Sequence, residues 1–471
     1  MHGSHFNQAC VELKARTVRT FKAAAHGLCK RLAIANALIA DYMSKEHVIH
    51  YDKLTNLPNR LYFTQTLQSE LDAAKASDVN SALILIDLLE FKSINDVYGL
   101  DVGDRVLIHV SARLEKLAPA NGIVSRLSSD EFLLYLPQEY CELDLLEFVS
   151  LTFDDLSRPY QIDNWQIRIG LTCGIALAKE ANYVTSELLA NVDIAQQYAK
   201  QHSSQHFSLF LPAMKADKLR MQQVAESIQD GLDNNEFSLH YQAKVNKHAE
   251  VVGYEALIRW NNHALGELSP TEFIPIAEQS GKIRHISTWV IKQAFFDIPT
   301  LLAHSGEHIK VAINLSTIDL KAQTLLSTLE LAMLEHGING KNVEFEITET
   351  SFLENIERVN IVFDKLRALG CSVALDDFGT GYSSLSYLTK IHLNVLKLDK
   401  QFVDELIASK HGKVITESIV NMAHQLNMRV CAEGIETKEQ AQQLIEIGCE
   451  ELQGFYYSKP APLSAILSSK K

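Results

Sequence analysis

The sequence predicts an α/β protein in which a barrel of alternating strands and helices follows a smaller α+β domain. The length of 471 residues exceeds that of one ordinary domain. Residues 216–471 alternate apolar strands with helical stretches eight times, which matches the size of a TIM-like (β/α)8 barrel. Residues 51–211 combine a hairpin with helix-separated strands, a pattern typical of a mixed sheet.

The composition is that of a soluble, acidic, globular chain. Hydrophobic residues make up 46% and charged residues 22%, and the formal net charge is −14, which argues against a partner such as polymeric nucleic acid or an anionic membrane surface. The longest nearly apolar run, residues 32–40, is far shorter than the ~20 residues of a membrane span. The seven cysteines have no metal or redox spacing. We therefore expect a cytoplasmic protein without a membrane span.

The first segment, residues 1–50, predicts a helix with one apolar stripe. The stripe repeats every 3.5 residues over three heptads, which is typical of a coiled-coil seam and hence of a homodimer. The alternative is an amphipathic helix that packs on its own chain. The stripe consists of Phe21, Ala25, Leu28, Leu32, Ala35, Ile39 and Tyr42.

The second segment, residues 51–211, predicts a mixed sheet. Its strands are expected at 82–88, 123–127, 131–136 and 167–178, and its helices at 104–117 and 185–200. A tight turn at Ser128–Asp130 joins the second and third strands. A short junction at 211–218, which contains Pro212, leads to the barrel.

The third segment, residues 216–471, supplies the barrel. Helices are expected at 317–336, 356–369, 413–426 and 438–447. The eight strands are expected at 237–245, 251–258, 309–315, 343–348, 371–376, 394–399, 429–433 and 450–456.

Acidic and amide residues recur in or at the ends of these strands. In a parallel barrel the carboxyl ends of all strands meet at one rim, where barrel active sites lie. Crowded carboxylates are costly unless cations neutralise them, and oxygen ligands favour Mg²⁺ or Mn²⁺. The adjacent pair Asp376–Asp377 suits a two-metal centre that activates water for phosphodiester hydrolysis. The rim residues are Glu255, Asn314, Glu346, Asp376, Asp377, Lys397, Glu433 and Gln453.

Seven motifs in the barrel region resemble those of EAL-type cyclic-di-GMP phosphodiesterases. The resemblance spans roughly residues 230–465, with the motifs in order at matching spacing. One departure is Ala243, where the family usually has proline. The motifs are YEALIRW (254–260), INLS (313–316), EITET (346–350), DDFGTGYSSL (376–385), LKLDKQFV (396–403), AEGIET (432–437) and QGFYYSKP (453–460).

The resemblance implies a role for each matching position. Glu255, Asn314, Glu346 and Asp376 resemble ligands of a first metal ion, and Asp376 with Asp377 those of a second. Lys397 resembles the residue that holds the attacking water, and Glu433 a general base or organiser of the metal site. Gln453 resembles a residue beside the bound water, and Glu436 one that anchors the loop 378–385.

Arg259 resembles a contact to the substrate phosphate, and the residues support that role independently. It follows Glu255 by four positions at the strand exit, where a guanidinium can clamp a phosphate oxygen. The glycines at 379 and 381 are typical of a loop that moves over a site.

The second segment resembles GGDEF-type diguanylate cyclases. The motifs that carry this resemblance are DKLTNLPNR (52–60), IDLLEFKSINDVYGLDVGD (86–104) and RLSSDEF (126–132). Asp87 and Glu131 resemble metal ligands, and Asn95 and Asp104 resemble contacts to guanine. The retained residues imply a site for GTP as a regulator.

The departures from that family predict that no cyclic-di-GMP is made. Ser128 and Ser129 replace both glycines of the signature turn, where we expect a steric penalty and side chains in the way of the nucleotide phosphates. Leu89 and Leu100 replace a usual aspartate and histidine. A regulatory GTP site and a dimerisation scaffold are the two remaining hypotheses for this domain.

The resemblance thus implies a metal-dependent enzyme that hydrolyses cyclic-di-GMP to linear 5′-pGpG. The alternative is a non-catalytic cyclic-di-GMP receptor. Such receptors in this family typically lose metal ligands, whereas every ligand position is filled here.

Overall fold

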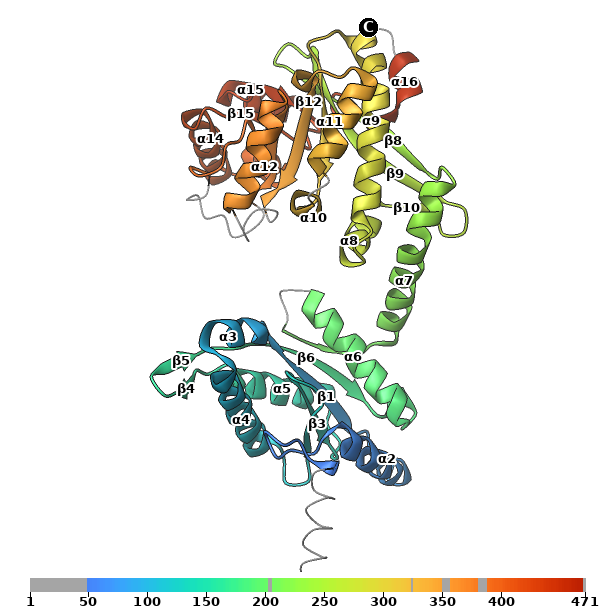
Figure 1. The fold of residues 1–471 in the computed structure, drawn as a ribbon, viewed down its shortest axis with the longest axis vertical. Helices are drawn as coiled ribbons and strands as arrows, with labels where there is room; N and C mark the ends of the chain where they lie inside the picture. The colour runs from blue at the N-terminus through green and yellow to red at the C-terminus, as the bar shows by residue number, and fades with distance from the viewer. Residues whose placement is uncertain (1–48, 202–205, 323–324, 350–355, 380–387, 469–471) are drawn as a thin grey trace, which may run out of the picture. The chain divides into compact units, whose positions relative to one another are not determined.

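The computed structural model describes residues 49–201, 206–322, 325–349, 356–379 and 388–468. The chain divides into two compact units, with the boundary between Leu219 and Arg220 (Figure 1). The predicted coiled-coil stripe, residues 21–42, lies outside the described residues.

The first unit is built on a five-stranded sheet in the order β2-β3-β1-β6-β7. All pairs are antiparallel except β6 with β7. The predicted long strand 167–178 is wrong at its start, because β5 pairs with β4 in a separate hairpin while β6 pairs with β1. The strands are β1 (Ala82–Leu89), β2 (Ile123–Arg126), β3 (Glu131–Leu136), β4 (Tyr160–Ile162), β5 (Trp165–Ile167), β6 (Gly170–Leu177) and β7 (Phe207–Leu209).

Helices cover both faces of this sheet. Alternate residues of β1 point to opposite faces, so Ile84 and Ile86 join one hydrophobic cluster while Leu83 and Leu85 join another. The first cluster includes residues of α4 and α5, and the second includes residues of α2 and α6. The helices are α2 (Arg60–Ala76), α3 (Phe91–Tyr98), α4 (Leu100–Leu117), α5 (Glu142–Leu156) and α6 (Thr185–Gln201).

The predicted junction 211–218 is largely helical. Helix α7 (Pro212–Asp233) begins at the junction proline and continues into the second unit. Proline is favoured at a helix start, because its missing N–H has no intrahelical partner there. The segment is therefore a continuous helix rather than a loop.

The second unit is a closed barrel, because β8 pairs with both β9 and β16. Strand β8 runs antiparallel to both neighbours, so the all-parallel expectation is wrong for this strand. Only residues 246–250 link β8 to β9, and a parallel connection needs a crossover of about a dozen residues or more. The barrel strands are β8 (Phe237–Val245), β9 (Val251–Asn262), β11 (Lys310–Leu315), β12 (Val343–Thr348), β13 (Ser372–Phe378), β14 (Val395–Leu398), β15 (Arg429–Ala432) and β16 (Glu451–Leu452).

Helices surround the barrel, and two short strands extend its sheet: β10 (Gly266–Leu268) on β9 and β17 (Ala461–Pro462) on β8 (Figure 1). The predicted helix 317–336 contains two helices, of which the first is capped by Ser316. The helices are α8 (Pro270–Gln279), α9 (Ile283–Ser305), α10 (Thr317–Lys321), α11 (Leu325–His336), α12 (Ile356–Ala368), α13 (Lys400–Ala408), α14 (Lys410–Gln425), α15 (Lys438–Ile447) and α16 (Leu463–Ser468).

The apolar core of the second unit lies between the strands and the helices. In β12, Val343, Phe345 and Ile347 belong to this core, while Glu344 and Glu346 alternate with them on the inner face. Both glutamates are buried. The interior of the barrel is therefore lined largely by polar and charged side chains.

Candidate functional site

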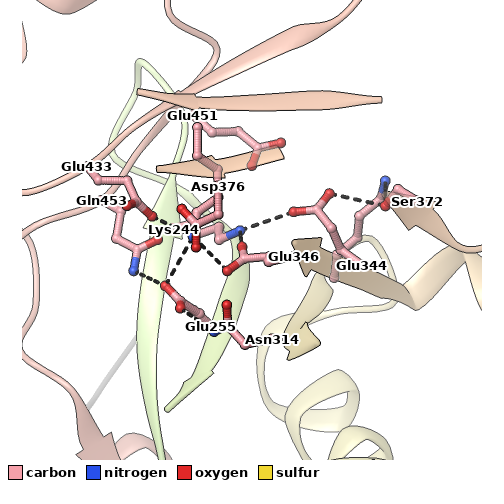
Figure 2. A network of polar contacts seen from close by, with 12 residues as sticks. Lys244, Glu255, Asn314, Glu344, Glu346, Ser372, Asp376, Glu433, Glu451 and Gln453 are labelled. Carbon is pink, nitrogen blue, oxygen red and sulfur yellow. Dashed lines mark hydrogen bonds and ion pairs between the residues drawn. The ribbon is translucent and has the colours of Figure 1, made fainter. Parts of the chain in front are cut away.

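The structure brings seven of the eight predicted rim residues into one polar network (Figure 2), whereas the eighth, Asp377, is exposed. Glu255, Asn314 and Glu346 come from β9, β11 and β12, and Asn314 is the register partner of Glu346. Asp376 and Lys397 come from β13 and β14. The other two members directly follow β15 and β16; they are Glu433 and Gln453.

The ammonium group of Lys397 lies at the centre of this network. Its Nζ is 2.6 Å from Glu346 Oε2, 2.7 Å from Glu433 Oε1 and 3.0 Å from Asp376 Oδ2. A fourth carboxylate, Glu255, is 3.8 Å away. Burial alone would lower the pKa of Lys397, but the surrounding carboxylates raise it well above its usual value. Lys397 is therefore a fixed cation.

Glu255 is held by amides from both sides. Asn314 Nδ2 donates to its Oε1 at 2.9 Å, and Gln453 Nε2 donates to its Oε2 at 2.7 Å. Burial opposes ionisation of Glu255, yet Lys397 outweighs that effect and its pKa is lowered. Glu255 therefore presents an ionised carboxylate to the interior of the barrel.

A β-bulge in β13 gives two adjacent aspartates different surroundings, because Asp376 is buried in the network and Asp377 is exposed. The register with β14 shifts between Leu375 and Phe378, so one extra residue is inserted. Asp377 takes up a left-handed backbone with φ 53°, which Asp tolerates better than most residues. Burial and the neighbouring Asp376 raise the pKa of Asp377. The sequence showed the pair of aspartates but not the bulge.

The donors of this network fit divalent cations chemically. Four carboxylates surround Lys397, and Lys244 adds a second ammonium at Glu346, so acidic groups outnumber cations in a buried place. Burial, together with Asp376 and the other carboxylates nearby, raises the pKa of Glu433 well above its usual value despite the contact with Lys397. The donor atoms are oxygens, as Mg²⁺ and Mn²⁺ prefer. Within the described ranges, no three acidic, histidine or cysteine side chains lie, as they stand, where they could hold a metal ion.

A second polar layer lies at the other end of the barrel, where the parallel strands begin. Lys244 Nζ is 3.1 Å from Glu344 Oε1 and 2.6 Å from Glu346 Oε1, so it joins the two layers (Figure 2). Arg429 and Ser372 also contact Glu344. Sequence reasoning missed this layer, although the alternation of charged and apolar residues in β12 signals it.

A cavity of about 290 Å³ opens beside the first layer. Four of its lining residues were predicted, namely Glu255, Glu433, Glu436 and Gln453. The sequence pattern did not single out the other six lining residues, because they are neighbours of the predicted acidic and amide residues and carry no carboxylate themselves. These are Gln242, Leu257, Lys400, Gly434, Gly454 and Phe455.

Two predicted residues lie at the margin of this arrangement. Arg259 is on the same face of β9 as Glu255 but does not line the cavity, and its guanidinium donates to the carbonyl oxygen of Ile258. Burial lowers the pKa of Arg259. Glu436 lines the cavity and forms an ion pair with Lys400.

The predicted mobile loop lies mostly outside the described residues, which stop at Gly379 and resume at Leu388. Gly379 has φ 91°, and its N–H donates to Glu349 Oε2 at 3.4 Å. The proposed contact between Glu436 and this loop stays a prediction.

In the first unit, the two predicted metal ligands Asp87 and Glu131 already accept hydrogen bonds from other side chains. Asp87 and Glu131 are register partners on neighbouring strands. Asp87 accepts hydrogen bonds from Gln196 at 2.8 Å and Lys200 at 3.0 Å, both from α6. Glu131 accepts from Ser128 at 2.9 Å.

The two predicted guanine contacts lie on neighbouring helices. Asn95 is on α3 and half-buried, and its Oδ1 packs against Gly103 so closely that a Cβ there would be 1.9 Å away. Asp104 is exposed on α4.

The steric penalty expected in the serine turn is absent. Neither Ser128 nor Ser129 has a positive φ, so neither needs the freedom of glycine. The carbonyl oxygen of Ser129 accepts from Arg126 at 2.8 Å, and Ser128 bonds to Glu131. The expected lack of cyclic-di-GMP synthesis is therefore attributed to the added serine side chains rather than to backbone strain.

No helix in the part of the chain that the structure describes is long and apolar enough to cross a bilayer.

Two family models match the chain. The EAL domain model covers residues 225–460, which is half of the chain. The model described as "Diguanylate cyclase, GGDEF domain" covers residues 49–206.

The curated relatives contain both domains of this chain. The bifunctional diguanylate cyclase/cyclic di-GMP phosphodiesterase MucR of Pseudomonas aeruginosa is 32% identical over 89% of this chain and 61% of its own length. The cyclic di-GMP phosphodiesterase NbdA of the same organism is 32% identical over 92% of this chain and 55% of its own length. PdeR of Escherichia coli, also named a cyclic di-GMP phosphodiesterase, is 31% identical over 88% and 62%. The chain thus spans little more than half the length of these relatives.

Solved structures show the same two folds. The phosphodiesterase of P. aeruginosa MucR in complex with c-di-GMP is 32% identical, with a TM-score of 0.50, and covers 52% of this chain and 99% of its own. The S helix-GGDEF-EAL structure of Vibrio cholerae LapD, bound to c-di-GMP, covers 89% of this chain and 99% of its own. Its TM-score is 0.58 at 20% identity, so it supports the fold alone.

Proposed function

This chain belongs to the EAL domain family and carries a GGDEF domain in front of the EAL domain, and on that premise we propose that its barrel hydrolyses cyclic-di-GMP to linear 5′-pGpG. The observation that carries the proposal is the convergence of four carboxylates on Lys397 at the rim of the barrel. The names of the relatives support the substrate and the reaction class.

We assign two divalent cations, Mg²⁺ or Mn²⁺, to this rim. Glu255, Asn314, Glu346 and Asp376 would hold one ion, and Asp376 with Asp377 the other. When bound, such ions make water a stronger nucleophile and offset the charge that develops on the phosphate. Asn314 is solvent-accessible, and turning its amide over would present an oxygen instead of the nitrogen.

The reaction replaces one phosphodiester bond. The oxygen of a water molecule bonds to phosphorus, the bond from phosphorus to the ribose 3′ oxygen breaks, and that oxygen takes up a proton. Lys397 can orient the water by donating a hydrogen bond. In its ionised form, which the ammonium of Lys397 at 2.7 Å favours, Glu433 can accept the proton that the water loses.

The cavity supports binding of a planar, anionic substrate next to these groups. Leu257 and Phe455 give it apolar walls, and Phe455 remains 57% exposed. Lys400 adds a cation at the cavity, and Arg259 is our proposed phosphate contact.

For the first domain we propose a regulatory or dimerisation role without synthesis of cyclic-di-GMP. The serine side chains of the turn and the contacts of Asp87 with Lys200 and Gln196 support this proposal. The two hypotheses differ in one respect: only a regulatory site, which would use Asp87, Asn95, Asp104 and Glu131, responds to GTP.

The decisive experiment incubates the full chain with cyclic-di-GMP and Mg²⁺ and identifies the product by chromatography. We expect pGpG, no product in EDTA, and recovery when Mg²⁺ or Mn²⁺ is restored. Ca²⁺ should support the reaction poorly, because its longer bonds suit the compact pair badly. Binding of cyclic-di-GMP without any product would instead identify a receptor.

A further inference from the structure

Both carboxylate oxygens of Glu346 are held by lysine ammonium groups. Lys397 Nζ is 2.6 Å from Oε2, and Lys244 Nζ is 2.6 Å from Oε1. Glu346 is 0% exposed, so water does not compete for either oxygen. A carboxylate with a charged donor on each oxygen has one preferred orientation.

Lys244 is itself fixed from the opposite end of the barrel. It is 2% exposed, and its second partner is Glu344 Oε1 at 3.1 Å. Glu344 is in turn held by Ser372 at 3.1 Å and Arg429 at 3.6 Å. A ladder of alternating charges therefore runs from the start of the parallel strands to the rim (Figure 2).

We propose that Lys244 is a positioning residue for the reaction: it holds Glu346 in the orientation in which this carboxylate completes the cation site. The consequence for hydrolysis rests on the proposed function. Lys244 is 2% exposed, does not line the cavity and is separated from Lys397 by Glu346, so we assign it no direct contact with a substrate. Its place depends on the reversed direction of β8, which puts the last residues of that strand beside the first residues of β9.

Removal of Lys244 should change the affinity for a metal ion in opposite directions, depending on whether Lys244 positions Glu346 or acts only as a nearby charge. If Lys244 acted only as a nearby positive charge, its removal would strengthen cation binding. If it holds Glu346 in place, its removal frees one oxygen of a buried carboxylate and weakens cation binding. Partners that orient metal ligands typically contribute about 10- to 100-fold in affinity or activity.

The test compares the full chain with its Lys244→Met variant. We expect Mn²⁺ affinity, measured by electron paramagnetic resonance, to fall about 10- to 100-fold. The kcat for cyclic-di-GMP should fall by a similar factor, while KM stays near the wild-type value. The matched control is Lys310→Met, which removes another lysine of the same barrel end whose Nζ contacts the Ser372 hydroxyl at 3.0 Å. This control should leave the Mn²⁺ affinity unchanged.

A second variant distinguishes a loss of Mn²⁺ affinity from a loss of folding stability. Lys244→Met leaves Glu344 without one cation, so the double variant Lys244→Met/Glu344→Gln removes both charges together. We expect it to recover thermal stability but not Mn²⁺ affinity. Recovery of Mn²⁺ affinity in the double variant would overturn the proposal, because Glu346 would then be competent without Lys244.

Failure of the proposed function remains distinguishable from failure of this inference. If the wild type binds Mn²⁺ but releases no pGpG, the function is wrong and the Mn²⁺ affinities still decide the role of Lys244. If the wild type binds no Mn²⁺, a crystal structure of Lys244→Met decides it. The proposal requires the Glu346 carboxylate to turn away from Lys397 in that variant, and an unchanged contact contradicts it.

Discussion

At the scale of single residues, the carboxylates of the site differ in their neighbours and therefore in their pKa shifts. Glu255 is ionised beside Lys397 and two amides, whereas the pKa of Glu433 is raised by burial and by its acidic neighbours. Carboxyl groups with opposite pKa shifts in one site are typical of catalytic centres. The residue types alone do not reveal this difference.

We predict that Glu255→Ala or Asp376→Asn abolishes hydrolysis of cyclic-di-GMP. Each removes a proposed metal ligand, and even outer partners of such ligands contribute about 10- to 100-fold, so the loss should exceed about 100-fold. Initial rates of pGpG formation in Mg²⁺ measure the effect. The exposed Glu335 supplies the control, and its alanine variant should turn over normally. Near-normal turnover of either site variant would refute the assignment.

Asp52 provides a prediction about pH. Its Oδ1 accepts from the backbone and hydroxyl of Thr55 and pairs with Arg126 at 2.9 Å. Burial opposes ionisation, but these contacts outweigh it and lower the pKa of Asp52 below 3.8. A lowered carboxyl pKa stabilises the folded state above the unfolded pKa, and this stabilisation is lost as the pH falls through the folded pKa.

Asp52→Asn should therefore lower the free energy of unfolding at neutral pH by about 1–2 kcal/mol, with a smaller difference near pH ~3. Urea denaturation at the two pH values measures it. Asp163→Asn is the control, because that carboxylate pairs with Arg105 on the exposed surface and should contribute little. A pH-independent difference would mean that the charge of Asp52 is irrelevant.

At the scale of elements, strand direction and one bulge assemble the site. The antiparallel β8 brings Gln242 beside Glu255 and Lys244 to the opposite end of the barrel. The bulge in β13 places an aspartate with left-handed backbone at the rim. Neither feature follows from the apolar pattern of the strands, because both depend on which strand pairs with which.

At Asp377 in the bulge, the effect of losing the carboxylate can be separated from the effect of straining the left-handed backbone. Asp377→Ala and Asp377→Asn both remove the carboxylate and should both slow hydrolysis. Alanine tolerates φ 53° less well than asparagine, so Asp377→Ala should be less stable by about 1 kcal/mol. Chemical denaturation of the two variants gives the difference. Equal stabilities would show that the left-handed conformation is not retained.

At the scale of the whole molecule, the main question is which activity belongs to each domain. We predict that the full chain makes no cyclic-di-GMP from GTP. The Glu255→Ala variant should be used, so that hydrolysis cannot hide a product. Accumulation of cyclic-di-GMP would overturn our interpretation of the serine turn.

GTP itself separates the two hypotheses for the first domain. If the domain is a regulatory site, millimolar GTP should change the rate of pGpG formation, and Asp104→Ala should remove the change. A flat response in the wild type would leave the scaffold hypothesis alone.

The predicted coiled coil gives a test of assembly. Light scattering should detect a dimer, and the double change Leu28→Glu with Leu32→Glu should weaken it by placing like charges across the seam. A dimer that survives unaltered would be held by the domains instead. A monomer at tens of micromolar would refute the seam and favour a helix that packs on its own chain.

The two folds in tandem and the candidate residues of the rim could be predicted from the sequence. The alternation of strands and helices is local, so it can be seen without pairing partners. The motifs pointed to the proposed site residues Glu255, Asn314, Glu346, Asp376 and Lys397, because active-site side chains of a barrel commonly lie at the ends of its strands.

The arrangement of these residues could be seen only in the three-dimensional structure. The contact of Lys244 with Glu346, the reversed β8 and the bulge beside Asp377 arise from strand pairing that a local pattern does not show. The serine turn shows the converse, since its expected strain disappears once the backbone angles are known. Register and direction are set by packing across the whole barrel, and a local pattern carries no information about them.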